Sequence, residues 1–290
     1  MFSLNRVQLI GYVTQPVSVR QTPSGTSVAD LNIATPYTFT TDSGENLSGV
    51  AYHSVTAWSG MADVAAQYLK PGSQVFISGR LQTDSWEDEK TSEKKSKTRI
   101  VAMDMIMLDP RDGQIQVPAT AKQLTQCLNR ADIIGNATKD PEVRTTTSGQ
   151  TVVSMGVATN ERWKDRTSNE IKERAEFHNV VIWGDLAKLA AETIKKGNRV
   201  HITGRVQTRS WETKQGSKRY TTEVIADTVS LLGVKNTDLT YSNEAPSFSK
   251  SSKSEAPAAV ASGMDASVEL STGVPPVNYE SEVKVEDLPF

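Results

Sequence analysis

The stretch GDLAKLAAETIKKG, Gly184–Gly197, interrupts a region of sequence that otherwise has the pattern of β-strands. Its larger apolar residues recur at helical spacing, at Leu186, Leu189, Ala190 and Ile194. The two lysines and the glycine that end the stretch are typical of a helix C-terminus. We therefore expect a single helix here, with strands on both sides of it.

The segments around this helix are short runs rich in Val, Ile, Thr and aromatic residues, separated by Ser-Gly, Lys-Gly or charged loops. They read VVSMGVAT and HNVVIWG before the helix, and RVHITGRVQT and YTTEVIADTVSLL after it. About five strands with one helix after the third is the plan of an OB-fold, a small Greek-key barrel that binds oligonucleotides or oligosaccharides. The predicted fold class is therefore all-β.

The same pattern occurs twice in the chain. The run LNRVQLIGYVTQPVSVRQTPSGTSVADLNIAT from Leu4 aligns with LNRADIIGNATKDPEVRTTTSGQTVVSMGVAT from Leu128, and MADVAAQYLKPG repeats the helix. We predict two tandem OB-folds, each a five-stranded Greek-key barrel with one helix, over residues 1–110 and 126–235. We call them the first and second copy.

Two other segments have the composition of linkers and tails. Residues 111–125, with Gly113 and Pro118, are expected to link the two copies. Residues 236–290 consist largely of Ser, Ala, Pro and Glu with few large apolar residues. Such a segment buries too little apolar surface to offset the entropy of ordering, so we predict a disordered acidic C-terminal tail.

Charge is distributed unevenly along the chain. Residues 124–235 carry eighteen Lys or Arg against thirteen Asp or Glu, whereas residues 236–290 carry three against nine. A basic domain followed by an acidic tail suggests a polyanionic ligand and a tail that is repelled by it or competes with it.

The sequence argues against several functional classes. No apolar stretch approaches the roughly 18 residues that span a bilayer, and the start, which contains Arg6, does not resemble a signal peptide, so we expect a cytoplasmic protein. The single Cys127 excludes an internal disulfide, and His53, His178 and His201 lack metal-ligand spacing, so we predict neither a metal nor a cofactor. With no P-loop and no recognisable catalytic set, we predict that the protein is not an enzyme.

Aromatic residues stand among cations in residues 159–220. Trp163 lies in the run ERWKDR and Trp211 in the run TRSWETK, and we expect both in charged loops, where burial is costly to arrange. A general binder of single-stranded nucleic acid needs a cationic track for the phosphates and flat side chains for the bases. The sequence therefore predicts such a site in the second copy.

The strand FHNVVIW offers two faces by alternation. One face has Phe177, Asn179, Val181 and Trp183, and the other has His178, Val180 and Ile182. The second face, with two aliphatic residues, is the better candidate for the core.

The strings VATNERW, FHNVVIWG, KKGNRVHITGRVQTRSWE and RYTTEVIAD resemble the bacterial single-stranded DNA-binding protein family, and the first copy follows the pattern more loosely. The resemblance implies base-stacking positions at Trp163, Phe177, Trp183 and Trp211. It implies a DNA path along Arg130, Arg144, Lys164, Arg166, Lys172, Arg209 and Arg219. It also places His178 near a subunit contact, although a hydrogen-bonded structural histidine is an equal alternative.

The first copy keeps the aromatic positions, at Phe39, Tyr52, Trp58 and Trp86, but not their cationic neighbours. Asp84, for example, stands where the second copy has Arg209. We therefore predict that the second copy is the main binder of single-stranded DNA, and that the first binds more weakly and serves mainly in assembly.

The C-terminal residues VEDLPF resemble the short apolar tip with which the family recruits replication, recombination and repair enzymes. An apolar end can fill a pocket while neighbouring carboxylates meet basic residues on a partner. The residues expected to bind partners are Glu286, Asp287, Leu288, Pro289 and Phe290.

The resemblance implies sequence-tolerant binding that protects exposed DNA strands, and a homodimer that brings four OB-folds together. The alternative is an RNA-binding or replication-restart accessory OB-fold protein. RNA recognition would favour specific contacts to 2′-hydroxyls, whereas stacking with phosphate neutralisation tolerates either sugar.

Overall fold

The computed structural model describes residues 2–40, 46–87, 94–109, 127–147, 149–164, 169–212 and 218–233. The first copy comprises β1 (Leu4–Val13), β2 (Ser18–Gln21), β3 (Ser27–Thr40), β4 (Asn46–Trp58), α1 (Gly60–Tyr68), β5 (Gln74–Glu87) and β6 (Lys94–Met107). The second comprises β7 (Leu128–Ala137), β8 (Glu142–Thr145), β9 (Thr151–Lys164), β10 (Ile171–Trp183), α2 (Gly184–Thr193), β11 (Arg199–Glu212) and β12 (Lys218–Leu232).

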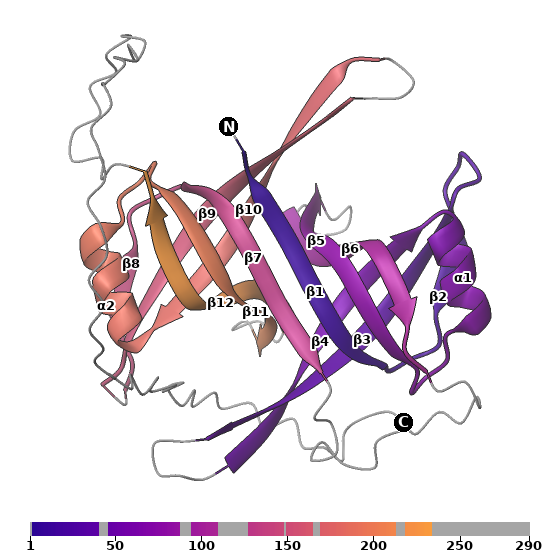
Figure 1. The fold of residues 1–290 in the computed structure, drawn as a ribbon, viewed down its shortest axis with the longest axis horizontal. Coiled ribbons are helices and arrows are strands. Elements are labelled where there is room, and N and C mark those ends of the chain that lie inside the picture. The colour runs from indigo at the N-terminus through magenta and orange to yellow at the C-terminus, as the bar shows by residue number, and fades with distance from the viewer. Residues whose placement is uncertain are drawn as a thin grey trace, which may run out of the picture.

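Each copy is a closed barrel, and the prediction of two all-β repeats with one helix each is confirmed (Figure 1). The strand order is β2-β3-β4-β6-β5-β1-β7-β11-β12-β10-β9-β8, and the additional pairings β3–β1 and β7–β9 close the two barrels. The structure differs from the expected five strands by one short strand in each copy, β2 or β8. Every residue of these two strands is exposed, so no apolar alternation marks them in the sequence.

The two barrels are joined edge to edge through β1 and β7. These strands pair antiparallel from Leu4↔Ile134 to Ile10↔Leu128, with Val7↔Ala131 at the centre. Val7 and Ala131 are equivalent positions in the repeat, so the two copies are related by a pseudo-two-fold axis at this pair. We call the β1–β7 pairing and the contacts beside it the seam, which crosses the middle of Figure 1.

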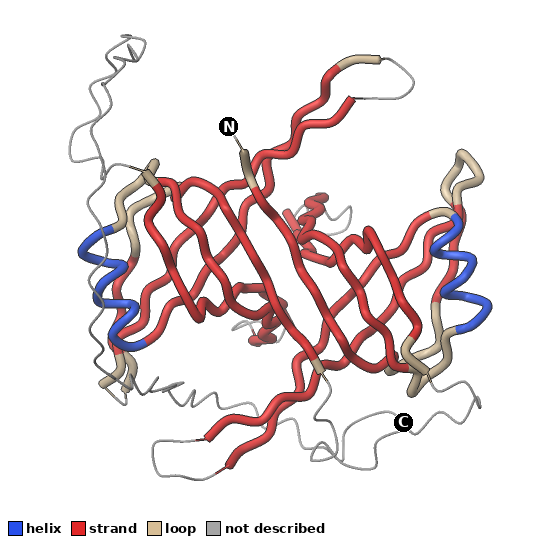
Figure 2. The backbone as a smooth tube through the Cα atoms, viewed as in Figure 1, coloured by secondary structure: helices blue, strands red, loops and turns tan. Residues whose placement is uncertain are grey.

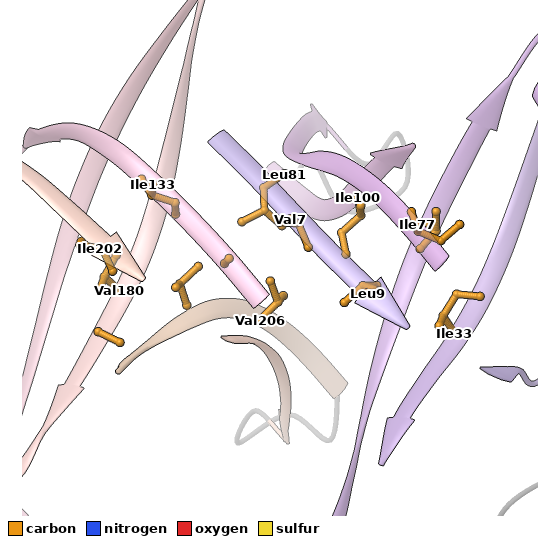
Figure 3. Close-up of a cluster of buried hydrophobic side chains, with 14 of the residues drawn as sticks. Val7, Leu9, Ile33, Ile77, Leu81, Ile100, Ile133, Val180, Ile202 and Val206 are labelled. Atoms are coloured by element: carbon orange, nitrogen blue, oxygen red, sulfur yellow. The ribbon is translucent and has the colours of Figure 1, made fainter. Parts of the chain in front are cut away.

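A single buried cluster runs through both barrels, and Figure 3 shows part of it. Alternate residues of β1 and β5 point inward, so Leu9 and Ile77 are fully buried, as is Ile202 in the second copy. At the bulge in β11 the backbone of Ile225 approaches so closely that a Cβ on Gly204 would lie 2.0 Å from its carbonyl oxygen. This position therefore requires glycine.

The helices cover opposite ends of the molecule (Figure 2). In α2 the residues that face the barrel are Ala187 and Ala190, followed by Ile194 just beyond the helix, all nearly inaccessible to solvent. Two corrections follow. The helix ends at Thr193, earlier than the stretch to Gly197 suggested, and Leu189 is 56% exposed rather than core. The small Ala187 takes the inward position, since it lies three residues before Ala190 on the same helix face.

Candidate nucleic-acid interface

Two long hairpins extend beyond the barrels, one from each copy and in opposite directions (Figure 2). The β9–β10 hairpin pairs without interruption from Trp183↔Val152 to Ile171↔Lys164. The β3–β4 hairpin does the same in the first copy, from Val28↔Trp58 to Thr40↔Asn46. We call the outer part of the β9–β10 hairpin, residues 159–164 and 171–176, the second arm. The equivalent part of the β3–β4 hairpin, residues 35–40 and 46–51, is the first arm.

Large aromatic side chains lie exposed on these strands. Trp163 is 42% exposed near the end of β9, and Phe177 is 67% exposed on β10. In the first copy, Trp58 on β4 is 42% exposed and Trp86 near the end of β5 is 47% exposed. Because large aromatics are usually mostly buried, their exposure on regular strands is informative.

The other aromatic candidates are less exposed, or their side chains lie outside the described part of the structure. Trp183 and Tyr52 are half-buried, and burial raises the pKa of the Tyr52 hydroxyl. Phe39 and Trp211 lie on described strands, but their side chains are outside the described part of the structure. Trp163 and Trp211 were expected in loops, and instead both lie within strands. For Trp163 the reason is that β9 continues past the barrel, where successive residues from Asn160 to Lys164 are exposed or partly exposed and the apolar alternation that marks a strand is lost.

The pairing register separates two of the predicted stacking residues. Trp163 pairs with Lys172, whereas Phe177 pairs with Ala158. These two pairs are separated by an odd number of residues on each strand. Side chains alternate between faces, so Trp163 and Phe177 lie on opposite faces of the β9–β10 hairpin. The expected division of β10 is otherwise observed: His178, Val180 and Ile182 are buried and Phe177 is exposed, although Val181 is buried as well.

The structure describes the surroundings of several predicted cations. Lys164 and Lys172 are exposed on the second arm. Arg130 Nε donates to Asp132 Oδ2 over 2.9 Å, and Arg144 Nη2 lies 3.5 Å from Glu142 Oε2. Arg166, the side chain of Arg219 and the tail residues Glu286–Phe290 lie outside the described residues, as do the linker residues 111–125 and residues 236–290.

Arg209 belongs to a charge pair that sequence reasoning missed. Its Nε and Nη2 donate to the buried carboxylate of Glu223 over 2.8 and 2.5 Å. The first copy has the reversed pair at the same place, where Arg99 donates to Asp84. Burial alone would raise the pKa of Asp84, but hydrogen bonds from Arg99 and Gln82 and the nearby guanidinium groups hold it below its ordinary value. Arg209 therefore offers less free charge to a phosphate than the sequence suggested.

Comparison with known proteins agrees with the repeat and the barrels. The model of the single-strand binding protein family matches residues 4–108 and again residues 128–232. The chain belongs to this family. A relative named single-stranded DNA-binding protein from Thermus aquaticus is 35% identical over 227 residues, covering 77% of this chain and 82% of the relative. One of the same name from Deinococcus radiodurans is 29% identical over 263 residues, covering 90% and 86%.

A solved structure of the family has the same two-barrel arrangement. The crystal structure of the wild-type single-stranded DNA binding protein from Thermus aquaticus superposes with a TM-score of 0.63 at 29% identity, covering 81% of this chain and 95% of that one. The fold class and the family resemblance are thus confirmed. Among the described residues of this family member, no helix is long and apolar enough to cross a membrane, and no three acidic, His or Cys side chains gather as metal ligands would.

Each copy of the family domain contains one buried histidine. A hydrogen bond of 2.8 Å joins His178 Nε2 and Thr159 Oγ1, and one of 2.7 Å joins His53 Nε2 and Thr35 Oγ1. His53 Nε2 also lies 3.5 Å from Asn129 Nδ2, across the seam. The geometry of His178 matches the structural alternative, while its counterpart His53 does touch the other copy.

Stability should fall with acidity because of these rings. Burial lowers the pKa of His53 and His178 from 6.5 to about 4, so the unfolded chain gains protons at a higher pH than the folded one. The contribution of each neutral histidine to the free energy of unfolding is fully present above pH 6.5 and is lost as the pH falls towards 4. Between about pH 8 and pH 5 this loss is about 2 kcal/mol for each histidine. Urea unfolding at several pH values should show that the free energy of unfolding falls less steeply with decreasing pH in a His178→Asn variant than in the parent. Equal slopes in the parent and the variant would contradict the assignment.

Proposed function

We propose that this protein binds single-stranded DNA with little sequence preference, through base stacking and phosphate neutralisation. The observation that carries the proposal is the exposure of Trp163 on the second arm, where it pairs across the hairpin with Lys172 and precedes Lys164. An unpaired strand displays base faces and phosphates along one line, and this arm offers a ring and two ammonium groups within one hairpin end. Family membership supports the same conclusion, since the matched relatives carry the name single-stranded DNA-binding protein.

We propose the same residues for this surface as the sequence predicts, but we expect them to contribute unequally to binding. Trp163, Phe177, Lys164 and Lys172 are exposed, with Trp163 and Lys172 on one face of the β9–β10 hairpin and Phe177 and Lys164 on the other. Arg209, Arg130 and Arg144 are paired with carboxylates, so they would contribute after exchanging those partners for phosphates. The binding itself involves no bond making or breaking, and we propose no catalytic role. A coat of this kind would protect exposed strands during replication, recombination and repair in the cytoplasm.

Tryptophan fluorescence tests the proposal directly. Oligo(dT) added to the whole chain should quench the emission, and the affinity should fall as salt is raised because phosphate contacts release counterions. Duplex DNA should bind far more weakly, since its bases are stacked within the helix and unavailable to the rings. Preference for oligo(U) over oligo(dT) would instead favour the RNA-binding alternative, and quenching by duplex alone would refute the proposal.

The second copy is proposed as the main binder, with the first copy weaker. Equivalent aromatics allow a matched test, because Phe177 on β10 corresponds to Tyr52 on β4. We expect Phe177→Ala to weaken oligo(dT) binding by roughly fivefold or more, as loss of one stacked ring does. Tyr52→Ala should change it less than about twofold. Thermal melts would check that both variants fold, and a larger loss for Tyr52→Ala would reverse the assignment.

We also propose a homodimer that brings four OB-folds together, and a row of apolar side chains supports it. Leu128 pairs with Ile10, Ile10 with Phe76, and Phe76 with Ile106, across the four strands β7, β1, β5 and β6. These residues alternate with the buried ones, so they face out of the barrel, and Ile106 is 50% exposed. An exposed apolar row on a sheet marks a contact surface, and a second copy of the same row would cover it by two-fold symmetry.

Partner recruitment is proposed for residues 286–290. Phe290 would enter an apolar pocket on a replication, recombination or repair enzyme while Glu286 and Asp287 meet basic side chains at its rim. A chain lacking these five residues should bind oligo(dT) as the parent does and fail to retain such enzymes on coated DNA. Equal retention by both chains would refute the role.

A further inference from the structure

Side chains of the second arm fasten it to strand β5 of the first copy. The Thr83 backbone N–H donates to Glu176 Oε2 over 3.0 Å, and Arg174 Nη2 donates to the Thr83 carbonyl over 3.1 Å. Arg174 Nε also lies 2.6 Å from Glu176 Oε1. One peptide position of the first copy is therefore held at both its donor and its acceptor by an ion pair from the second copy. We call Arg174, Glu176 and Thr83 the latch.

Burial makes the latch specific. Glu176 is only 4% exposed, and a carboxylate in such a place is stable only when its partners are correctly placed. Two outer ion pairs reinforce the contact: Arg80 Nη1 lies 3.4 Å from Glu161 Oε2, and Arg174 Nη2 lies 3.7 Å from Asp84 Oδ1. Both again join the second arm to β5.

The latch occurs on one side of the pseudo-two-fold axis. The repeat places Gly49 where the second copy has Arg174, and Ala51 where it has Glu176, opposite Thr208 in place of Thr83. The side chains of Gly49 and Ala51 have no donor or acceptor, so neither can form a hydrogen bond with a peptide group. The first arm therefore lacks the side chains that fasten the second arm, although the barrels themselves are equivalent.

One exposed tryptophan of each copy follows a residue of the outer ion pairs. Trp163 is two residues beyond Glu161 on β9, and Trp86 is two residues beyond Asp84 on β5, so each shares a strand face with a residue of the outer ion pairs. Two residues along a strand span about 7 Å, so each tryptophan lies about that far along its own strand from a residue of an outer ion pair. The rings of the two copies are thus attached to the same fastened junction.

We propose that Trp163 and Trp86 belong to one composite surface, which guides a single DNA strand from the second copy to the first, and that Arg174 and Glu176 are positioning residues that hold its halves in register. The inference rests on the proposed function, and it gives the weaker first copy a part in binding. A strand long enough to reach both copies gains from their fixed placement, because its second contact is made at a high effective concentration. A strand that fills only one copy gains nothing.

The test compares two lengths of oligo(dT) on the full chain. OB-folds bind roughly 4 to 16 nucleotides each, so we use oligonucleotides of about 8 and about 30 nucleotides. The latch variant Arg174→Gly/Glu176→Ala installs the residues that the first copy itself has. We expect it to bind the longer oligonucleotide roughly 10-fold more weakly than the parent and the shorter one within about twofold. The control Asp185→Ala/Lys188→Ala removes an exposed ion pair of 2.8 Å from α2 and should bind both lengths as the parent does.

Amide hydrogen exchange without DNA tests the latch separately. Exchange at Thr83 should be faster in the latch variant, while Thr208 exchanges as in the parent. Should the double variant fail to fold, Arg174→Ala, a partly exposed position, should give the same length-dependent loss, and Arg174→Lys a smaller one. Parent protein that binds neither oligonucleotide would refute the proposed function. Parent protein that binds both, with a latch variant that weakens for both lengths equally or for neither, would refute only the composite surface.

Discussion

Replacing Trp163 with alanine should weaken oligo(dT) binding by about 5- to 150-fold. Loss of one base-stacking ring costs about 1–3 kcal/mol, and Trp163 is the exposed ring that stands beside both exposed lysines of the second arm. The salt dependence should keep the slope of the parent, because no phosphate contact is removed. Trp163→Phe, which retains a flat ring, should lose much less. Fluorescence anisotropy of a labelled oligonucleotide at several salt concentrations measures both quantities.

Tyr68 provides the control for this experiment. It is an exposed aromatic residue of α1, at one end of the molecule, and Tyr68→Ala should bind oligo(dT) as the parent does. The melting temperature of Trp163→Ala should also remain near that of the parent, since the ring lies beyond the barrel core. If Trp163→Ala and Tyr68→Ala bind equally well, the second arm is not the stacking surface.

Replacing Ile106 with glutamate should dissociate the proposed homodimer. The change places a carboxylate in the row of Leu128, Ile10, Phe76 and Ile106, and two-fold symmetry introduces it twice in each dimer. A buried charge without a partner costs several kcal/mol, so two of them should raise the dimer dissociation constant by at least roughly a thousandfold. Sedimentation velocity at micromolar concentration should show the parent with twice the mass of the variant.

Leu189→Glu is the matched control for the assembly. Leu189 is 56% exposed on α2, close to the 50% of Ile106, and the chemical change is the same. That variant should remain dimeric. A dimer that persists in Ile106→Glu would move the contact to another face, and a parent that sediments as a single chain would remove the homodimer from the account.

Much of the architecture could be predicted because the sequence repeats itself. Two aligned runs, each with short apolar strands and one helix, specify two barrels whatever the details of either. The short strands β2 and β8 escaped because they are exposed on all sides and carry no alternation. The arms escaped for a related reason: beyond the barrel, Trp163 stands in a strand whose neighbours are all polar.

The candidate site was predictable in its residue types and not in its pairings. The Arg209–Glu223 pair depends on the register of β11 against β12, in which Gln207 stands opposite Glu223. The latch depends on how the two barrels meet along the seam, and the segments it joins are more than ninety residues apart in the chain. Neither relation leaves a local pattern of hydrophobicity or charge.

The β1–β7 pairing has a consequence for how the halves of this protein can differ. In an assembly of identical subunits, every substitution appears in all subunits. A latch gained at one contact between two barrels would therefore be gained at every equivalent contact. Here both strands belong to one polypeptide, and a change in one barrel is not copied into the other. The reversal of Asp84–Arg99 into Arg209–Glu223, and the glycine at position 49 where the second copy has Arg174, are differences of a kind that an assembly of identical subunits could not maintain.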